Sequence, residues 1–310
     1  MKIFVGIASY ARPTAFKLSL LSLLRTQMID GIIAVIDVNN WREKNLYLEA
    51  LSHVRERGVE VILDISERRR GFVNARNRVL DLANETLKTD DVLILFDDDY
   101  VCPNKESLRA ALVRLYENSD VGVVAGRVVD LRKRSFDPDF YLNILPGLTD
   151  ILFKLTGFVF LDTKHGPRYT YFTPPLRALR AKVVKQGVRF DPEFRGTGYR
   201  SEDDFNLQVI RLRYKIVFEP RFWVYHLGLE YGGCRTESLA ERFYWKSRNN
   251  ACFIKKHRLG LSRLTLSTSI IVAYSLLNGF ENAKFALKGF VDCLSAELTM
   301  NNIKFKLVQS

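Results

Sequence analysis

Three consecutive carboxylates, Asp97, Asp98 and Asp99, directly follow the apolar run at residues 92–96. Neighbouring negative charges repel one another and have low strand propensity, so a fold tolerates them best where a cation offsets the charge. The apolar run is typical of a buried parallel strand, and ligands of open α/β sheets bind just beyond the carboxyl ends of such strands. Carboxylates there suit Mg²⁺ or Mn²⁺, which usually bridge to phosphate. The alternative is a solvated acidic turn that caps the helix near Pro103.

A second acidic cluster, Glu202, Asp203 and Asp204, follows Ser201 and the glycine-containing loop 195–199. This position predicts the first turn of a helix, where the helix dipole favours carboxylates and Ser201 serves as the cap. Capping does not exclude chemistry, because a carboxylate held at a helix N-terminus beside a pocket is well placed to act as a general base.

The elements that must position these clusters alternate along the first half of the chain. Apolar runs predict strands and the amphipathic stretches between them predict helices, which indicates an α/β fold with a doubly wound, mostly parallel, Rossmann-like sheet. Neither a G-x-G-x-x-G nor a Walker A loop follows the first strand, which argues against dinucleotide and P-loop chemistry. The predicted strands are 3–8, 32–37, 59–63, 91–96 and 121–125, and the predicted helices are 13–26, 43–57, 74–87 and 105–116.

The second half of the chain is less regular. Residues 130–173 are predicted to form a long excursion over the sheet, after which order returns at 177–186. A helix at 202–212 and a strand at 215–219 follow, and the chain beyond residue 237 is expected to be helical.

Composition restricts the class of partner. The 310 residues carry a formal net charge of +12, which suits nucleotide phosphates or an anionic membrane surface. Nucleic acid is not expected as a partner, because no helix-turn-helix, zinc-finger or RNP pattern is present. The four cysteines are widely spaced, which predicts reduced thiols in a cytoplasmic setting, without zinc or disulfides: Cys102, Cys234, Cys252 and Cys293. A strand is predicted from residue 2, so a cleaved secretory signal is not expected.

Taken together, the motifs resemble family 2 glycosyltransferases, which are inverting enzymes of the GT-A fold. Residues 7–13 are similar to the family's opening strand and P-T-Y-N-R-P turn, although Ala8 stands where proline is usual. The other matches follow in the family's order over residues 2–258. They are the second-strand signature, the R-G-x-x-x-A-R-N segment, the D-x-D strand end, the G/S-E-D motif and two closing segments, at 36–40, 70–77, 96–99, 201–203, 224–228 and 244–249.

The resemblance implies a donor site for a nucleotide-sugar. Asp37 would accept hydrogen bonds from the base, Asp97 would contact the nucleoside, and Asp99 would ligate Mg²⁺ or Mn²⁺ on the diphosphate. Asp97 and His226 are the further metal-ligand candidates, and a satisfied structural histidine is the alternative for His226. The remaining donor-site candidates are Ser9, Tyr10, Arg12, Arg76 and Asp98, with an ordinary solvated arginine as the alternative for Arg76.

The resemblance also implies the acceptor side. Asp203 would deprotonate the acceptor hydroxyl as it attacks the anomeric carbon, which gives inversion in one displacement. Glu202 and Asp204 lie beside it and compete for that role. Arg248 and Asn249 are candidate diphosphate contacts, although a charged helix face explains them equally well.

The C-terminal part suggests a membrane surface. Residues 1–258 are expected to form the catalytic domain and 259–310 a helical extension. The uncharged stretch 264–280 is short and interrupted by polar residues, which disfavours a transmembrane span. Basic residues precede it, which favours peripheral attachment to the cytoplasmic face of an anionic membrane. A helical cap on the domain and a dimer contact are the alternatives.

The predicted activity is therefore metal-dependent, inverting transfer of a sugar from a nucleotide-sugar donor to a hydroxyl or phosphate acceptor, such as a lipid-linked glycan. A nucleotidyltransferase is one alternative, but it would need a basic, glycine-rich loop that residues 8–11 do not provide. A catalytically inactive, membrane-associated sugar-binding protein is the other. The presence of Asp97, Asp99 and Asp203 argues against it.

Overall fold

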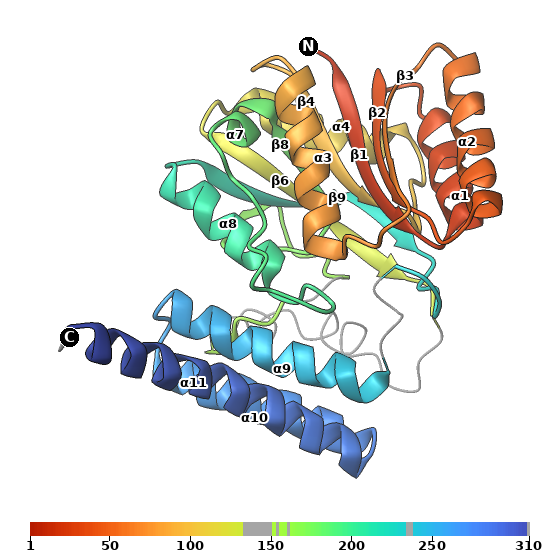
Figure 1. Cartoon of the computed structure of the whole chain (residues 1–310). Helices are drawn as coiled ribbons and strands as arrows, with labels where there is room; N and C mark the ends of the chain where they lie inside the picture. Colours follow the sequence, from red (N-terminus) through yellow and green to blue (C-terminus); the bar gives the residue numbers. More distant parts are fainter. Residues whose placement is uncertain (133–150, 153–154, 160–161, 234–237, 309–310) are drawn as a thin grey trace.

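A computed structural model of the chain contains an α/β domain and a layer of three C-terminal helices beside it (Figure 1). It describes residues 1–132, 151–152, 155–159, 162–233 and 238–308, with side chains through residue 295. Cys234 and residues 133–150 of the predicted excursion lie outside the described residues.

The sheet alternates with helices as the sequence predicts. Its described part has nine strands in the order β3-β2-β1-β4-β8-β6-β9-β5, and β7 pairs with β9. Strands β3, β2, β1 and β4 run parallel to one another, as do β6 and β9. Strand β8 is antiparallel to both β4 and β6, and β5 and β7 are antiparallel to β9. The strands are β1 (Ile3–Tyr10), β2 (Gly31–Asp37), β3 (Glu60–Ser66), β4 (Val92–Asp97), β5 (Tyr100–Val101), β6 (Val121–Asp130), β7 (Arg168–Tyr169), β8 (Arg177–Arg180) and β9 (Lys215–His226).

Helices cover both faces of this sheet, which explains why β2 and β4 are apolar along nearly their whole length. One core packs against α1, α2 and α4, and the other packs against α3, α7 and α8. The helices of the domain are α1 (Pro13–Leu24), α2 (Trp41–Glu56), α3 (Phe72–Thr86), α4 (Lys105–Glu117), α7 (Ala181–Lys185) and α8 (Ser201–Arg211).

The start of helix α2 and the end of strand β9 differ from the prediction. Helix α2 starts two residues earlier than expected, because the side chain of Asn40 accepts a hydrogen bond from the Glu43 amide at 3.0 Å and caps the helix. The strand predicted to end at residue 219 is longer: β9 continues past Glu219 to His226. A register shift opposite Gly126 and Arg127 of β6 accommodates Pro220, so the ladder resumes beyond it.

The C-terminal layer consists of α9 (Leu239–Lys256), α10 (Leu261–Leu277) and α11 (Phe280–Val308), which pack against one another. Among the described helices, none has both the length and the apolar character needed to cross a bilayer. Gly289 of α11 lies so close to α9 that a Cβ there would stand 2.2 Å from the Tyr244 carbonyl oxygen.

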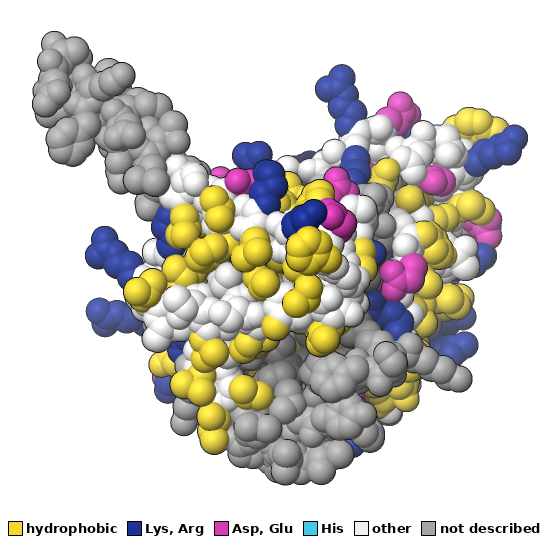
Figure 2. Space-filling view, turned by 90° about the horizontal axis from the view of Figure 1, so that it is seen from below, with side chains coloured by type: hydrophobic (Ala, Val, Ile, Leu, Met, Phe, Trp, Pro, Cys, Tyr) yellow, Lys and Arg dark blue, Asp and Glu magenta, His cyan; other side chains and the backbone are white. Residues whose placement is uncertain are grey.

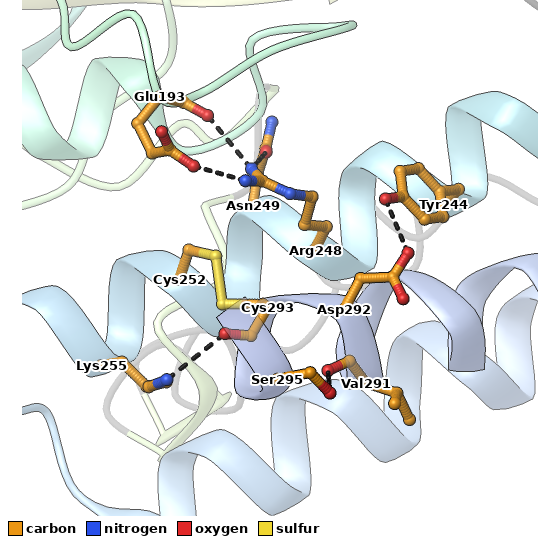
Figure 3. The surroundings of a disulfide bond; sticks show 10 residues. All are labelled: Glu193, Tyr244, Arg248, Asn249, Cys252, Lys255, Val291, Asp292, Cys293 and Ser295. Carbon is orange, nitrogen blue, oxygen red and sulfur yellow. Dashed lines mark hydrogen bonds and ion pairs between the residues drawn. A yellow bond between two sulfur atoms is a disulfide. The ribbon is translucent and has the colours of Figure 1, made fainter. Parts of the chain in front are cut away.

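A disulfide joins Cys252 of α9 to Cys293 of α11 (Figure 3). The prediction of reduced thiols is therefore wrong for these two residues. Their sequence separation of 41 residues hid the pairing, which arises only when α11 folds back along α9. Cys102 is a free, buried thiol as predicted.

Candidate functional site

The triplet Asp97–Asp99 lies at the carboxyl end of β4, beside the ends of β1 and β2. Asp98 and Asp99 are only 4% and 2% exposed, so the alternative of a solvated acidic turn is wrong. The Ser9 hydroxyl donates to Asp98 at 2.6 Å. Arg12 Nη1 donates to Asp98 Oδ1 at 3.2 Å and to Asp99 Oδ2 at 2.9 Å. A buried guanidinium thus offsets part of the charge of the triplet.

The two buried carboxyls are tuned in opposite directions. Burial, together with the neighbouring Asp99 charge, raises the pKa of Asp98 to about 7. Burial also acts to raise the pKa of Asp99, but His226 and Arg12 outweigh it and lower that pKa. Asp99 is therefore the more acidic carboxyl of this pair.

His226 reaches the triplet because β9 continues past its bulge. The strand register sets it opposite Tyr100 of β5 on one side and Asp130 of β6 on the other. His226 Nε2 lies 3.2 Å from Asp99 Oδ2, and its Nδ1 lies 3.6 Å from Asp130 Oδ2. Asp130 is itself held by Arg132, whose Nε donates to it at 2.8 Å. A carboxylate thus stands behind the imidazole, the arrangement that orients metal-binding histidines.

Arg76 of α3 is buried, with 3% of its surface exposed, and pairs with Asp97. The alternative of an ordinary solvated arginine is therefore wrong. Burial acts to lower the pKa of Arg76, but Asp97 and Glu202 outweigh it and raise that pKa. Arg76 is thus a fixed positive charge between the two acidic clusters.

Asp37 closes the other end of the site. It ends β2, accepts the Arg70 amide at 2.6 Å through Oδ2, and is 3% exposed. Its Oδ1 is buried and accepts no hydrogen bond within the described residues, although Arg70 Nη1 stands 3.4 Å away. Beside it, the Tyr10 hydroxyl donates to Asn39 at 2.8 Å. An unused buried acceptor next to an aromatic ring suits a planar base with N–H donors.

The second triplet occupies the first turn of α8, as predicted, but the prediction of Ser201 as the cap is wrong. Ser201 is the first residue of the helix, and the N-cap is Arg200, whose left-handed backbone makes no capping hydrogen bond through its side chain. The three carboxylates also have different partners. Asp204 is fully buried, with Lys256 Nζ at 2.5 Å, His257 Nε2 at 2.7 Å and Gln208 Nε2 at 2.9 Å. Asp203 is 6% exposed and pairs with Arg200 at 2.7 Å. Burial raises the pKa of Glu202, while the charges of Arg177 and Arg76 oppose that rise.

Arg200 connects Asp203 to the helical layer. Its Nε donates to Asn250 of α9 at 3.0 Å, and Asn250 Nδ2 donates to Ser267 of α10 at 2.7 Å. All three side chains are nearly or completely buried. This network positions Asp203 through residues more than 45 positions away in sequence.

The fold that carries this arrangement is similar to those of several solved structures. A mannosyltransferase, PcManGT from Pyrobaculum calidifontis in complex with GDP-Man and Mn²⁺, is similar with a TM-score of 0.58 and 12% identity, over 99% of this chain and 80% of that one. S. aureus TarS 1-349 in complex with UDP-GlcNAc is similar with a TM-score of 0.61 and 15% identity, over 96% and 81%. GalNAc-T7 with UDP, GalNAc and Mn²⁺ is similar with a TM-score of 0.54 and 15% identity, over 82% and 48%.

The chain has the GT-A fold. No protein-family model matches its sequence, and no curated protein is similar to it in sequence. The structures it resembles are glycosyltransferases with nucleotide-sugar donors or their products, two of them with Mn²⁺. In this GT-A domain, Asp37, Asp97 and Asp99 all lie at the carboxyl edge of the parallel strands, where ligands of open α/β sheets bind.

Candidate metal ligands are few in this part of the GT-A domain. Across the part of the chain that the structure describes, no three His, Cys, Asp or Glu side chains are grouped so as to hold a metal ion. Asp99 Oδ2 and His226 Nε2 are 3.2 Å apart and form an ion pair. Burial acts to lower the pKa of His226, but Asp130 and Asp99 outweigh it and raise that pKa to about 9, so a metal ion that binds this nitrogen must displace its proton. An oxygen and an imidazole nitrogen fit Mn²⁺, with the other positions left to a diphosphate and water. Arg12 shares the same carboxylate oxygen.

Arg248 and Asn249 contact the loop before α8 rather than the first triplet. Arg248 pairs with Glu193 (Figure 3). Asn249 Nδ2 donates to the Arg195 carbonyl at 2.8 Å. Both thus join α9 to this loop.

Sequence reasoning missed Asp130, Arg132, Asn250 and the role of Arg200. Only Arg200 left a signal, since it lies three residues before Asp203, at the spacing of neighbours on a helix.

Proposed function

We propose that this protein is a metal-dependent, inverting glycosyltransferase of the family 2 type. It would transfer a sugar from a nucleotide-sugar to a hydroxyl or phosphate acceptor. The observation that carries the proposal is the grouping of Asp97, Asp99 and His226 with two buried arginines at the ligand-binding edge of a GT-A sheet.

The donor would lie across the ends of β2, β1 and β4. Asp37 Oδ1 would accept an N–H of the base, with Tyr10 beside it. Asp97, held by Arg76, would contact the nucleoside. Ser9, Arg12 and Asp98 form the buried floor that fixes Asp99.

A divalent ion bound to Asp99 and His226 would neutralise negative charge on the departing diphosphate. Asp130 would hold the histidine ring in register for this role. Support comes from the Mn²⁺ in similar structures and from the contact of the two side chains at the ligand-binding edge of the sheet.

Asp203 would act as the general base. Burial raises the pKa of Asp203 above its ordinary value while Arg200 opposes the rise, and a carboxylate with a raised pKa is a stronger base. The acceptor oxygen would bond to the anomeric carbon as the carbon–oxygen bond to the diphosphate breaks. The acceptor proton would pass to Asp203, and the nucleoside diphosphate would leave from the opposite face. Glu202, in the field of Arg76, is the second candidate for this role.

The test is a panel of nucleotide-sugars and nucleoside diphosphates, read as thermal shifts with and without Mn²⁺, followed by a turnover assay with the donor that binds. We expect one nucleotide to stabilise the protein only when Mn²⁺ is present. A protein that binds no member of the panel with Mg²⁺ or Mn²⁺ is not this transferase.

A further inference from the structure

The outer surface of the helical layer has an unusual composition. The face of α10 that packs inward buries two apolar side chains, Leu264 and Ile271, and three small polar ones, Ser267, Thr268 and Ser275. The face that points outward carries large apolar ones, with Leu266 and Leu277 exposed to 40% and 85%. The outward face of a helix at a water-soluble surface is normally polar, so these exposed apolar side chains are unusual.

Neighbouring residues extend this apolar surface onto α11. Phe280, Leu287 and Val291 are exposed to 68%, 49% and 52%. Figure 2 looks onto the layer from below and shows hydrophobic side chains gathered across its surface, with Lys and Arg side chains mostly toward the margins. We call this surface, formed by α10 and the first part of α11, the outer face. A contiguous exposed apolar surface of this kind marks an interaction site.

Charge indicates which partner covers it. Residues 258–295, which leave out Lys255 and Lys256 of α9, contain four Lys or Arg against two Asp or Glu, and residues 259–280 contain no acidic residue. Lys284 and Lys288 on α11 pair with the only two acidic residues of that stretch, Glu281 and Asp292. Two copies of a chain with net charge +12 repel each other, whereas an anionic bilayer attracts such a surface.

We propose that the outer face docks on an anionic lipid membrane, with α10 and the first part of α11 lying in the plane of the headgroups. Apolar side chains insert among the acyl chains, and basic side chains at the margin contact lipid phosphates. No described helix is able to cross a bilayer, so attachment by one face is the mode that this composition permits. Docking itself does not depend on transferase activity. Its consequence, a lipid-linked acceptor, does rest on the proposed function.

Flotation of the full chain with lipid vesicles tests the proposal. Vesicles of phosphatidylcholine alone are compared with an equal mixture of phosphatidylcholine and phosphatidylglycerol. We expect flotation with the anionic vesicles at low salt and weaker flotation in about 1 M salt, where the screening length falls to about 3 Å. Failure to float with anionic vesicles at low salt overturns the proposal.

A triple variant of the outer face, Leu266→Ser, Leu277→Ser and Phe280→Ser, should lower partition into anionic vesicles by on the order of 100-fold. The matched control changes three exposed apolar residues on other helices: Leu18→Ser, Leu46→Ser and Val113→Ser. The control should float like the parent chain. Equal flotation of the triple variant and the parent excludes the outer face.

Two further measurements keep the test decisive. A fluorophore on Ser269→Cys, in a Cys234→Ser background, reports insertion without removing any apolar side chain, and we expect a blue shift only with anionic vesicles. Light scattering identifies the competing occupant. A parent dimer that the triple variant dissociates, with no flotation, assigns the face to a second copy of the chain. Nucleotide binding by the triple variant is measured in parallel, so that failure of docking and failure of the donor site are read separately.

Discussion

The two acidic triplets on either side of the candidate site are neutralised from different parts of the chain. Asp97–Asp99 pairs with Arg12 and Arg76, which lie in the first βα units. In the second triplet, Asp204 pairs with Lys256 and His257 at the end of α9, and Asp203 depends on Arg200, which Asn250 of α9 holds. The sheet therefore completes the first triplet, the proposed donor half, whereas the helical layer completes the second, the proposed acceptor half.

The largest expected effect is a loss of turnover when Asp203 of the second triplet is changed. Asp203→Asn should lower turnover by about 10²- to 10⁴-fold, because the amide cannot accept the acceptor proton. Nucleotide binding, which belongs to the first triplet, should be unchanged by calorimetry. If Glu202→Gln shows this loss while Asp203→Asn does not, the base is Glu202.

The neighbouring residue should behave differently. Asp204→Asn should lower the free energy of unfolding by about 2–4 kcal/mol, because it leaves Lys256 and His257 without their buried carboxylate. The partial exposure of Lys256 to solvent keeps the loss from being larger. Urea denaturation measures this. The variant should retain Mn²⁺-dependent nucleotide binding while folded. Stability equal to that of the parent would contradict the structural role.

The same pair predicts a pH dependence. Burial acts to raise the pKa of Asp204, but its contacts with His257 and Lys256 outweigh burial and lower that pKa below 3.8. A carboxyl whose pKa is lowered by folding contributes stability above its ordinary pKa and loses it as pH falls further. The stability difference between the parent and Asp204→Asn should therefore shrink below about pH 4. Unfolding midpoints measured from neutral to acidic pH check the sign, and a constant difference contradicts it.

The first triplet is tested through its metal. Asp99→Asn should weaken Mn²⁺-dependent binding of the nucleoside diphosphate by at least about tenfold, because one of the two protein ligands is lost. Thermal shift with and without Mn²⁺ measures this, and Asp90→Asn, an exposed residue, is the control. Unchanged metal-dependent binding in a folded Asp99→Asn variant removes Asp99 from the site.

The smallest effect concerns the link between the halves. Ser267→Ala removes the acceptor for Asn250 Nδ2 and should cost about 1 kcal/mol of stability. Turnover should fall less than tenfold, since Arg200 retains Asn250 as its partner. Ser269→Ala on the outer face is the matched control and should change neither quantity. Identical behaviour of the two variants would mean that the network does not position Asp203.

The donor half could be predicted because its residues follow strands whose apolar runs are visible in the sequence. The carboxyl ends of parallel strands meet at one edge, so Asp37 and Asp97–Asp99 had to converge. His226 was found by resemblance alone, since its position depends on β9 continuing past Pro220, which sequence patterns do not reveal.

The acceptor half could be predicted only in part. The start of α8 was predicted one residue late, at Glu202 instead of Ser201, and its cap was misassigned. The partners of Asp203 and Asp204 depend on packing against α9, about which spacing along the chain carries no information. The disulfide between Cys252 and Cys293 was missed for the same reason.

Helices α9 and α10 lie between the candidate site and the outer face, so they set the distance between the two. From Asp203, the network passes through Asn250 of α9 to Ser267 of α10, and the outer face lies on the far side of α10 (Figure 1). Two helix diameters amount to about 20 Å. If the outer face rests on lipid headgroups, the reacting hydroxyl must stand that far above them. The thickness of the layer would then select the acceptor by length. A sugar attached directly to its lipid would be too short to reach the site, whereas a longer glycan would reach it.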